Sequence, residues 1–315
     1  MHINIDFDRI NFNDLGINEI ATDMGLLDPL VDIPSKNTKD YKGISVNVSG
    51  KANKEELKDV AEYGIKSVPY YRTQAQTNPT YKKNIKGAPN VNFAREGTIN
   101  KLQEVNEKLG KIGLELIVLD AHRSPVTQNI LFAAFKEQFF EKIGCARSSQ
   151  NGTNTEIIAK KREFYDKQAT EFAVEFCSNA EGFSPSDSRT WTIHSTGGAV
   201  DVYLLDKKSG KVVDMGEEYF DNPKPITNTG YYEKMKDEEL LPNQKGFRDA
   251  RRVLYNAMTS SGFVNYGYEC FHYSYKDPYW ACVKGVNAEY GYRKSPREER
   301  VASIVASLQQ AKKQK

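Results

Sequence analysis

The chain has 315 residues, of which 39% are hydrophobic and 27% are charged. This composition permits a packed core in one large domain or two small ones, and it differs from that of disordered chains. The 44 basic and 42 acidic residues give a formal net charge of +2, so the charge balance offers no reason to expect a nucleic-acid partner.

Two features bear on the compartment. Residues 1–14 are polar and acidic and lack the apolar core of a signal peptide, and no later run approaches the ~18 apolar residues that span a bilayer. The four cysteines include no C-x-x-C pair, which argues against a zinc ribbon and favours free thiols in a reducing compartment, with a disulfide as the alternative. We therefore expect a cytoplasmic protein without a membrane partner.

The first 65 residues carry no chemical motif and are expected to form an N-terminal extension. We predict a short helix over residues 17–27 and a short strand over 44–48. Residues 53–63 predict a helix, because Asn53 is a good N-cap and glutamates follow in the first turn. We expect the extension to pack on the domain that follows, and a partner-binding module is the alternative.

The next segment changes from loop to helix signals. Residues 68–90 are rich in polar residues and contain three prolines, which predicts a strand followed by a long loop. Residues 92–109 predict a helix, because apolar side chains recur at helical spacing and Gly110 suits its C-terminal end.

A buried strand is predicted over residues 114–119, and it leads directly to Asp120 and Arg123. Ser124 as N-cap and Pro125 at the first helical position predict a helix that runs to about residue 143. Arg123 therefore lies at a strand-to-helix junction, from which a side chain reaches a site on a rigid base. The alternative is that Arg123 only pairs with Asp120 or caps a helix.

Polar loops separate the later elements. The remaining predicted elements are, in chain order, a helix over 156–177, a strand over 199–205, its hairpin partner over 211–213, a helix over 243–261, a strand over 264–275 and an exposed helical tail within 290–315.

Two of the four histidines lie in segments that suit a metal site. His194 precedes Asp201 by seven residues, and two glycines between them allow a tight backbone path. Asp201 interrupts an apolar strand, so it needs a partner if it is buried. His272 comes later in the chain. Two histidines and one carboxylate are a common ligand set for a catalytic zinc whose fourth position stays open, so we expect one zinc per chain.

Glu269 lies three residues before His272. A carboxylate near a metal that does not bind it can act as general base, which predicts a zinc hydrolase with Glu269 in that role. On a regular strand, positions three apart point to opposite faces. Both side chains can reach one metal only if the strand ends, bends or bulges between them.

Four ordered motifs resemble VanX-type D-alanyl-D-alanine dipeptidases, in the zinc DD-peptidase and hedgehog-like group. The resemblance covers roughly residues 66–285. The matching segments are Thr192 to Asp201 for S-x-H-x-x-G-x-A-x-D with Thr192 in place of Ser, Glu269 to His272 for E-x-x-H, Asp120 to Ser124 for D-A-Y-R-P with His122 in place of Tyr, and Met215-Gly216 followed by Phe220-Asp221 for M-G-x-x-F-D.

The resemblance implies further roles. It makes Arg123 the catalytic arginine that stabilises the oxyanion, Asp221 the anchor of the substrate's ammonium group, and Thr192 a hydroxyl of the substrate pocket. His122 takes the position of a tyrosine and is not expected to be a ligand. Residues 144–190 are longer than this part of the family, and this insertion is either a lid or a remote surface helix.

We therefore expect an α+β fold, in which a small antiparallel sheet carries the zinc ligands and helices flank it. The expected parts are the extension at 1–65, a zinc dipeptidase domain at 66–289 with its helical insertion, and the tail at 290–315. The expected reaction is hydrolysis of a small dipeptide, foremost D-Ala-D-Ala.

Three alternatives stand beside it: a peptidoglycan DD- or LD-carboxypeptidase or endopeptidase, a non-enzymatic zinc-stabilised binding protein, and an interaction protein that acts through its first 65 residues. The preferred dipeptide, the physiological role and the oligomeric state stay open.

Overall fold

The computed structural model describes residues 6–37, 40–74, 84–85, 88–146, 155–217, 225–296, 298–300 and 303. The strands are β1 (Asp6–Ile10), β2 (Leu57–Asp59), β3 (Lys66–Ser67), β4 (Phe93–Arg95), β5 (Leu114–Asp120), β6 (Ala199–Asp206), β7 (Lys211–Val213), β8 (Val264–Asn265) and β9 (His272–Ser274). The α-helices are α1 (Asn18–Asp23), α2 (Tyr70–Thr73), α3 (Glu96–Gly110), α4 (Pro125–Lys142), α5 (Thr155–Phe164), α6 (Asp166–Val174), α7 (Pro242–Thr259) and α8 (Pro278–Lys284). Short 3-10 helices include η2 (Ala52–Lys54), η3 (Val60–Tyr63) and η8 (Ile193–Thr196).

Strand β6 is the centre of the sheet, and all eight of its residues are buried. Strand β5 runs antiparallel along one edge of it. The other edge is shared, because β9 pairs with the beginning of β6 and β7 pairs with its end. Parallel pairs, β1 with β7 and β3 with β5, extend the sheet on both sides. The α+β prediction is confirmed, and the expected antiparallel arrangement holds for the central strands.

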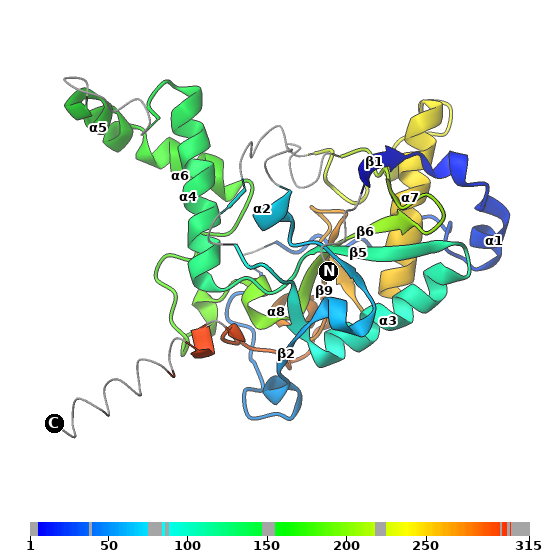
Figure 1. The fold of residues 1–315 in the computed structure, drawn as a ribbon, viewed down its shortest axis with the longest axis horizontal. Helices are drawn as coiled ribbons and strands as arrows, with labels where there is room; N and C mark the ends of the chain where they lie inside the picture. The colour runs from blue at the N-terminus through cyan, green and yellow to red at the C-terminus, as the bar shows by residue number, and fades with distance from the viewer. Residues whose placement is uncertain are drawn as a thin grey trace.

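Helices α3 and α7 supply much of the core that covers the sheet (Figure 1). Leu102, Val105 and Leu109 of α3 are fully buried, as the helical spacing of the sequence predicts. Helix α3 begins at Glu96, later than expected, because Phe93–Arg95 pair with β2 as a strand.

The predicted helix over residues 53–63 is wrong. Those residues form part of η2, then β2 and η3. The fully buried Arg95 explains the difference, since its guanidinium donates hydrogen bonds to the carbonyl oxygens of Asn53 and Glu55 and so draws that backbone into an extended path. The predicted strand over 44–48 is also wrong: within the described residues it makes only an isolated bridge between Val46 and Ala288.

Helices α4, α5 and α6 stand together to one side of the sheet (Figure 1). Helix α4 begins as predicted, with the Ser124 hydroxyl accepting a hydrogen bond from the Thr127 N–H at 3.2 Å. The single helix predicted over 156–177 is divided at Tyr165 into α5 and α6. The ring of Phe176, just after α6, stacks on Phe135 of α4 with centroids 4.8 Å apart, which fixes the end of α6 against α4.

The continuous strand predicted over 264–275 is wrong as well. It is two short strands, β8 and β9, joined by a turn through residues 266–271. The four cysteines, all within the described residues, are free thiols as predicted. No helix in the described part of the chain has the length and apolar character needed to cross a membrane. One of the polar loops predicted between the later elements, over residues 148–154, and most of the C-terminal tail lie outside the described residues.

Candidate metal centre

Two paired strands and one tight turn bring His194, Asp201 and His272 together. Asp201 on β6 and His272 on β9 are direct partners across the antiparallel pair, so their side chains lie on the same face. His194 belongs to η8, which ends at Gly197 with φ +77°. A Cβ at Gly197 would lie 2.5 Å from Leu57 Cδ2. The chain therefore needs glycine at this position to turn from His194 into β6.

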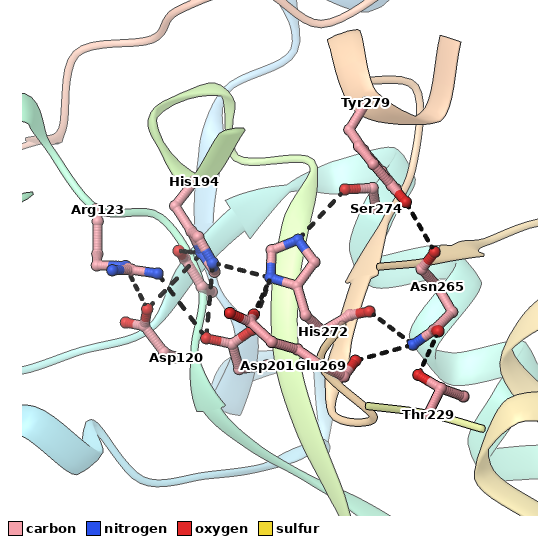
Figure 2. Close-up of polar contacts among 11 residues, drawn as sticks. Asp120, Arg123, His194, Asp201, Thr229, Asn265, Glu269, His272, Ser274 and Tyr279 are labelled. Atoms are coloured by element: carbon pink, nitrogen blue, oxygen red, sulfur yellow. Dashed lines mark hydrogen bonds and ion pairs between the residues drawn. The ribbon is translucent and has the colours of Figure 1, made fainter. Parts of the chain in front are cut away.

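The three side chains present their donor atoms to one point (Figure 2). His272 Nδ1 lies 2.9 Å from Asp201 Oδ1 and 3.2 Å from His194 Nε2. His194 Nε2 lies 3.6 Å from Asp201 Oδ2. Ligands about 2.0–2.1 Å from a tetrahedral zinc are about 3.3 Å from one another, so the observed spacing fits a zinc ion with little rearrangement.

The protonation of His194 is set by its surroundings. Its Nδ1 lies 2.7 Å from the carbonyl oxygen of Ala121, which can only accept a hydrogen bond. The proton is therefore placed on Nδ1, and the lone pair of Nε2 points to Asp201 and His272. Burial, with the nearby Arg123, holds the pKa of His194 well below its usual value, so the ring is neutral, as a metal ligand must be.

The other two members of the cluster are coupled to each other. Burial acts to lower the pKa of His272, but the hydrogen bond from its ring to Asp201 and the Asp201 charge outweigh burial and raise it. Burial acts to raise the pKa of Asp201, but His194 and His272 lower it. All three residues are 5% exposed or less. A buried carboxylate that faces two histidines and an arginine suits a cation.

Arg123 lies at the edge of the cluster. Its Nε is 2.6 Å from Asp120 Oδ2, and its Nη2 is 3.9 Å from Asp201 Oδ2. The pairing with Asp120 that the sequence offered as an alternative role is therefore present. This pairing holds one edge of the guanidinium. Arg123 also lines the cavity beside the cluster. His122, by contrast, places its Nε2 2.8 Å from the carbonyl oxygen of Arg293 and is not part of the cluster.

Glu269 lies in the turn between β8 and β9, where the chain breaks the strand that the sequence predicts. Its Oε2 is 3.8 Å from His272 Nδ1, and its side chain is 28% exposed. The side-chain amide of Asn265 donates to the carbonyl oxygens of both Glu269 and His272, and its oxygen accepts from Thr229 (Figure 2). Because Asn265 holds this turn, the side chains of Glu269 and His272, three residues apart, can face the same point.

A cavity of about 110 Å³ adjoins the cluster. Its walls come from α4, the segment after α6, η8 and the turn before β9, and they include Arg123, Gln128, Glu175, Cys177, Thr192, Thr227 and Glu269. The Thr192 hydroxyl is buried and has no hydrogen-bond partner among the described residues. Burial raises the pKa of the Cys177 thiol to about 12, so this thiol is uncharged where it lines the cavity.

The end of the predicted insertion forms part of this cavity. Residues 174–178 line it, and the Gln128 side-chain amide donates to the carbonyl oxygen of Ser178 at 2.8 Å. The sequence gives no signal for Gln128 or Cys177 as wall residues, because their position depends on how α6 packs against α4.

Asp221 lies outside the described residues. Arg251 holds the chain on both sides of that segment, because its guanidinium donates to the carbonyl oxygens of Met215 and Ile226. Thr227, which follows directly, lines the cavity.

A buried His-Asp-His cluster, open to a cavity and flanked by a glutamate and an arginine, is the arrangement of a single-metal peptidase. The chain belongs to the peptidase M15 family, described as D-ala-D-ala dipeptidase, whose family model matches residues 71–290, more than half of the chain. A comparison with curated proteins gave no match. The resemblance seen in the sequence motifs is thus confirmed at the level of the family.

Proposed function

We propose that this metallopeptidase-family protein hydrolyses a dipeptide, D-Ala-D-Ala foremost, with one zinc ion held by His194, Asp201 and His272. The observation that supports this most is the small cavity at the open side of the cluster. Ligand pockets commonly measure about 300–1,000 Å³, so a cavity of about 110 Å³ favours a substrate as small as a dipeptide over a longer peptide chain.

A zinc ion held by His194, Asp201 and His272 would lower the pKa of bound water toward neutrality and polarise the scissile carbonyl. The remaining steps belong to side chains of the protein. Glu269 Oε2 lies 3.8 Å from His272 Nδ1, but Glu269 is not one of the three residues whose ligand atoms all lie within 4.8 Å of one another. In the proposed mechanism, its carboxylate takes a proton from the attacking water and delivers it to the leaving amine.

Arg123 is proposed to stabilise the negative charge that develops on the carbonyl oxygen. Its pairing with Asp120 fixes the guanidinium before substrate arrives, and a fixed donor costs no reorganisation in the transition state. Burial acts to lower the pKa of Arg123, but Asp120 outweighs burial and raises it. The positive charge is therefore permanent at any pH of interest.

The ends of the substrate are assigned to Asp221 and Thr192. Asp221 is proposed to bind the free ammonium group of the first residue, and the unpartnered Thr192 hydroxyl to bind a polar atom of the substrate. A dipeptide carries a charge at each end, so one acidic anchor and the cavity wall at residues 174–178 are proposed to select short substrates together.

The test is hydrolysis of D-Ala-D-Ala, its N-acetyl derivative, L,D- and L,L-dipeptides and a D-Ala-D-Ala-terminated pentapeptide, each with and without chelator. We expect turnover of the free dipeptide alone, lost on chelation, and a strongly raised KM in Asp221→Ala. Equal rates on blocked and free dipeptides would instead indicate a carboxypeptidase. Zinc binding without turnover of any substrate would indicate a binding protein.

A further inference from the structure

The residues around His194 form a tight turn over 191–197, which we call the ligand turn. Hydroxyl groups of the turn itself donate hydrogen bonds to two carbonyl oxygens in its middle. Buried backbone carbonyl groups need partners of this kind. The carbonyl oxygens of Trp191 and Thr196, near the two ends of the turn, accept hydrogen bonds from side chains in other parts of the chain.

Lys42 is the donor at the first end of the ligand turn. Its partly buried ammonium group donates to the Trp191 carbonyl oxygen at 2.5 Å. The neighbouring Tyr41 is 2% exposed and belongs to the same buried apolar cluster as Ile193, which lines the cavity. Residues 41–42 therefore hold the beginning of the turn by one hydrogen bond and share its apolar packing.

Arg95 is the donor at the second end. Its Nε donates to the Thr196 carbonyl oxygen at 2.8 Å, and its backbone N–H donates to that of Gly197 at 2.9 Å. The guanidinium is fully buried, and its Nη1 lies 2.6 Å from the carbonyl oxygens of both Asn53 and Glu55. Because the donors of an arginine lie in one rigid plane, these contacts also fix the direction of Nε.

Leu57 packs directly against the second end. It is buried, and a Cβ on Gly197 would lie 2.5 Å from its Cδ2. Leu57 begins β2 and pairs with Arg95 on β4, so strand pairing holds both residues beside the turn. Lys42 and Leu57 precede the segment that the family model matches, which begins at residue 71. Residues outside the family match therefore contact both ends of the ligand turn.

We propose that Lys42 and Leu57 are positioning residues of the metal centre, which hold the ligand turn so that His194 meets the other two ligands. Residues 41–57 then support the catalytic site and do not form a separate partner-binding module. A site needs such support, because misplacement of its groups by about 1 Å can cost about 100-fold in rate. The inference rests on the proposed metal centre but concerns residues outside its ligand set.

The competing explanation is that these contacts only attach the N-terminal residues to the rest of the protein. Asn256 on α7 offers a matched control, because its side-chain amide donates to the carbonyl oxygens of Leu26 and Asp28 at 3.1 and 3.0 Å. Asn256→Ala therefore also removes hydrogen bonds that attach N-terminal residues, but it does so outside the ligand turn and residues 41–57.

Three variants test the two ends of the turn. Lys42→Met removes the donor and keeps much of the length of the side chain, whereas Lys42→Arg keeps a donor and serves as the conservative variant. Leu57→Ala removes the packing against Gly197. If the contacts position the turn, the first and third variants should disturb the metal centre, and Lys42→Arg should preserve it.

The experiment measures the zinc affinity of the full-length chain by competition with a chelating dye. It also records the visible absorption of the cobalt-loaded protein, which reports ligand geometry, and thermal unfolding of the metal-free protein. We expect about 10-fold weaker zinc binding in Lys42→Met and in Leu57→Ala, each with an altered cobalt spectrum, and near-wild-type values in Lys42→Arg. Asn256→Ala should lower the unfolding temperature but keep the wild-type zinc affinity and cobalt spectrum.

Wild-type zinc affinity in Lys42→Met or in Leu57→Ala would overturn the positioning role of that residue, and an equal loss of affinity in Asn256→Ala would overturn the proposal as a whole. Should Lys42→Met fail to fold, Leu57→Ala decides by the same criterion. A wild-type chain that binds neither metal would overturn the proposed metal centre and this inference with it. Tight zinc binding without hydrolysis of any dipeptide would overturn only the proposed function.

Discussion

Replacement of Glu269 by glutamine should stop catalysis and leave the metal in place. Glu269 Oε2 is 3.8 Å from His272 Nδ1, and the proposed ligands are three other side chains, those of His194, Asp201 and His272. The change keeps the size of the side chain but removes the base. General-base assistance is worth about 10²- to 10⁴-fold in rate, or about 3–5 kcal/mol of barrier, so we expect kcat to fall by that factor.

Stability should change little, because the Glu269 side chain is 28% exposed and the turn is held through backbone atoms by Asn265. Substitutions at such positions commonly stay within about 0.5 kcal/mol. The assay combines steady-state hydrolysis of D-Ala-D-Ala, zinc content and thermal unfolding. Glu175→Gln is the matched control, since Glu175 lines the same cavity and is exposed; it should retain activity within a few-fold.

Two outcomes would exclude the proposed role of Glu269. Loss of zinc in Glu269→Gln would make Glu269 a ligand and displace one of the three proposed ligands. Full activity with full zinc would place the general base elsewhere.

Three further predictions concern other parts of the site and its support. Arg123→Ala should lower kcat by at least about 100-fold and weaken a phosphinate transition-state analogue more than a substrate; equal weakening of both would argue against an oxyanion role. Gly197→Ala should cost at least about 1–2 kcal/mol in the free energy of unfolding, because φ is +77° and a Cβ would collide with Leu57; an unchanged urea midpoint would show that the turn does not require glycine. Burial lowers the pKa of His122 to about 4, below its unfolded value near 6.5, so the unfolded state binds more protons between these values and stability should fall by about 3 kcal/mol from pH 6.5 to 4; His122→Gln should flatten that slope, and an unchanged slope in urea titrations would refute the assignment.

The sequence predicts much of the cluster because two of its three residues lie close together in the chain. His194, Gly197 and Asp201 lie within eight residues, and a glycine turn into an apolar strand largely determines how they meet. His272 is found through its neighbour Glu269. The pairing of β6 with β9, which places Asp201 opposite His272, is a tertiary contact that no spacing within either segment specifies.

Errors in the predicted fold occur where a distant side chain determines the backbone. Arg95 donates hydrogen bonds to the carbonyl oxygens of Asn53 and Glu55, and these bonds prevent the helix that local propensity favours. Asn265 holds the turn that divides the last predicted strand, with Thr229 as its partner from elsewhere in the chain. The spacing of Glu269 and His272 shows that the strand must break between them, but it carries no information on what makes the break.

The residues around the ligands are hardest to predict. Ser274 is an ordinary residue at the end of a strand, and only the three-dimensional structure shows that its hydroxyl oxygen lies 3.5 Å from His272 Nε2. Cys177 and Gln128 become cavity walls only through the packing of Phe176 on Phe135.

Zinc content, measured by elemental analysis on the purified chain and three ligand variants, decides whether the His-Asp-His cluster is a metal centre. We expect about one zinc per wild-type chain and markedly less in His194→Ala, Asp201→Ala and His272→Ala, with hydrolysis of D-Ala-D-Ala lost in proportion. Full zinc content in all three variants would contradict the assignment of these residues as ligands.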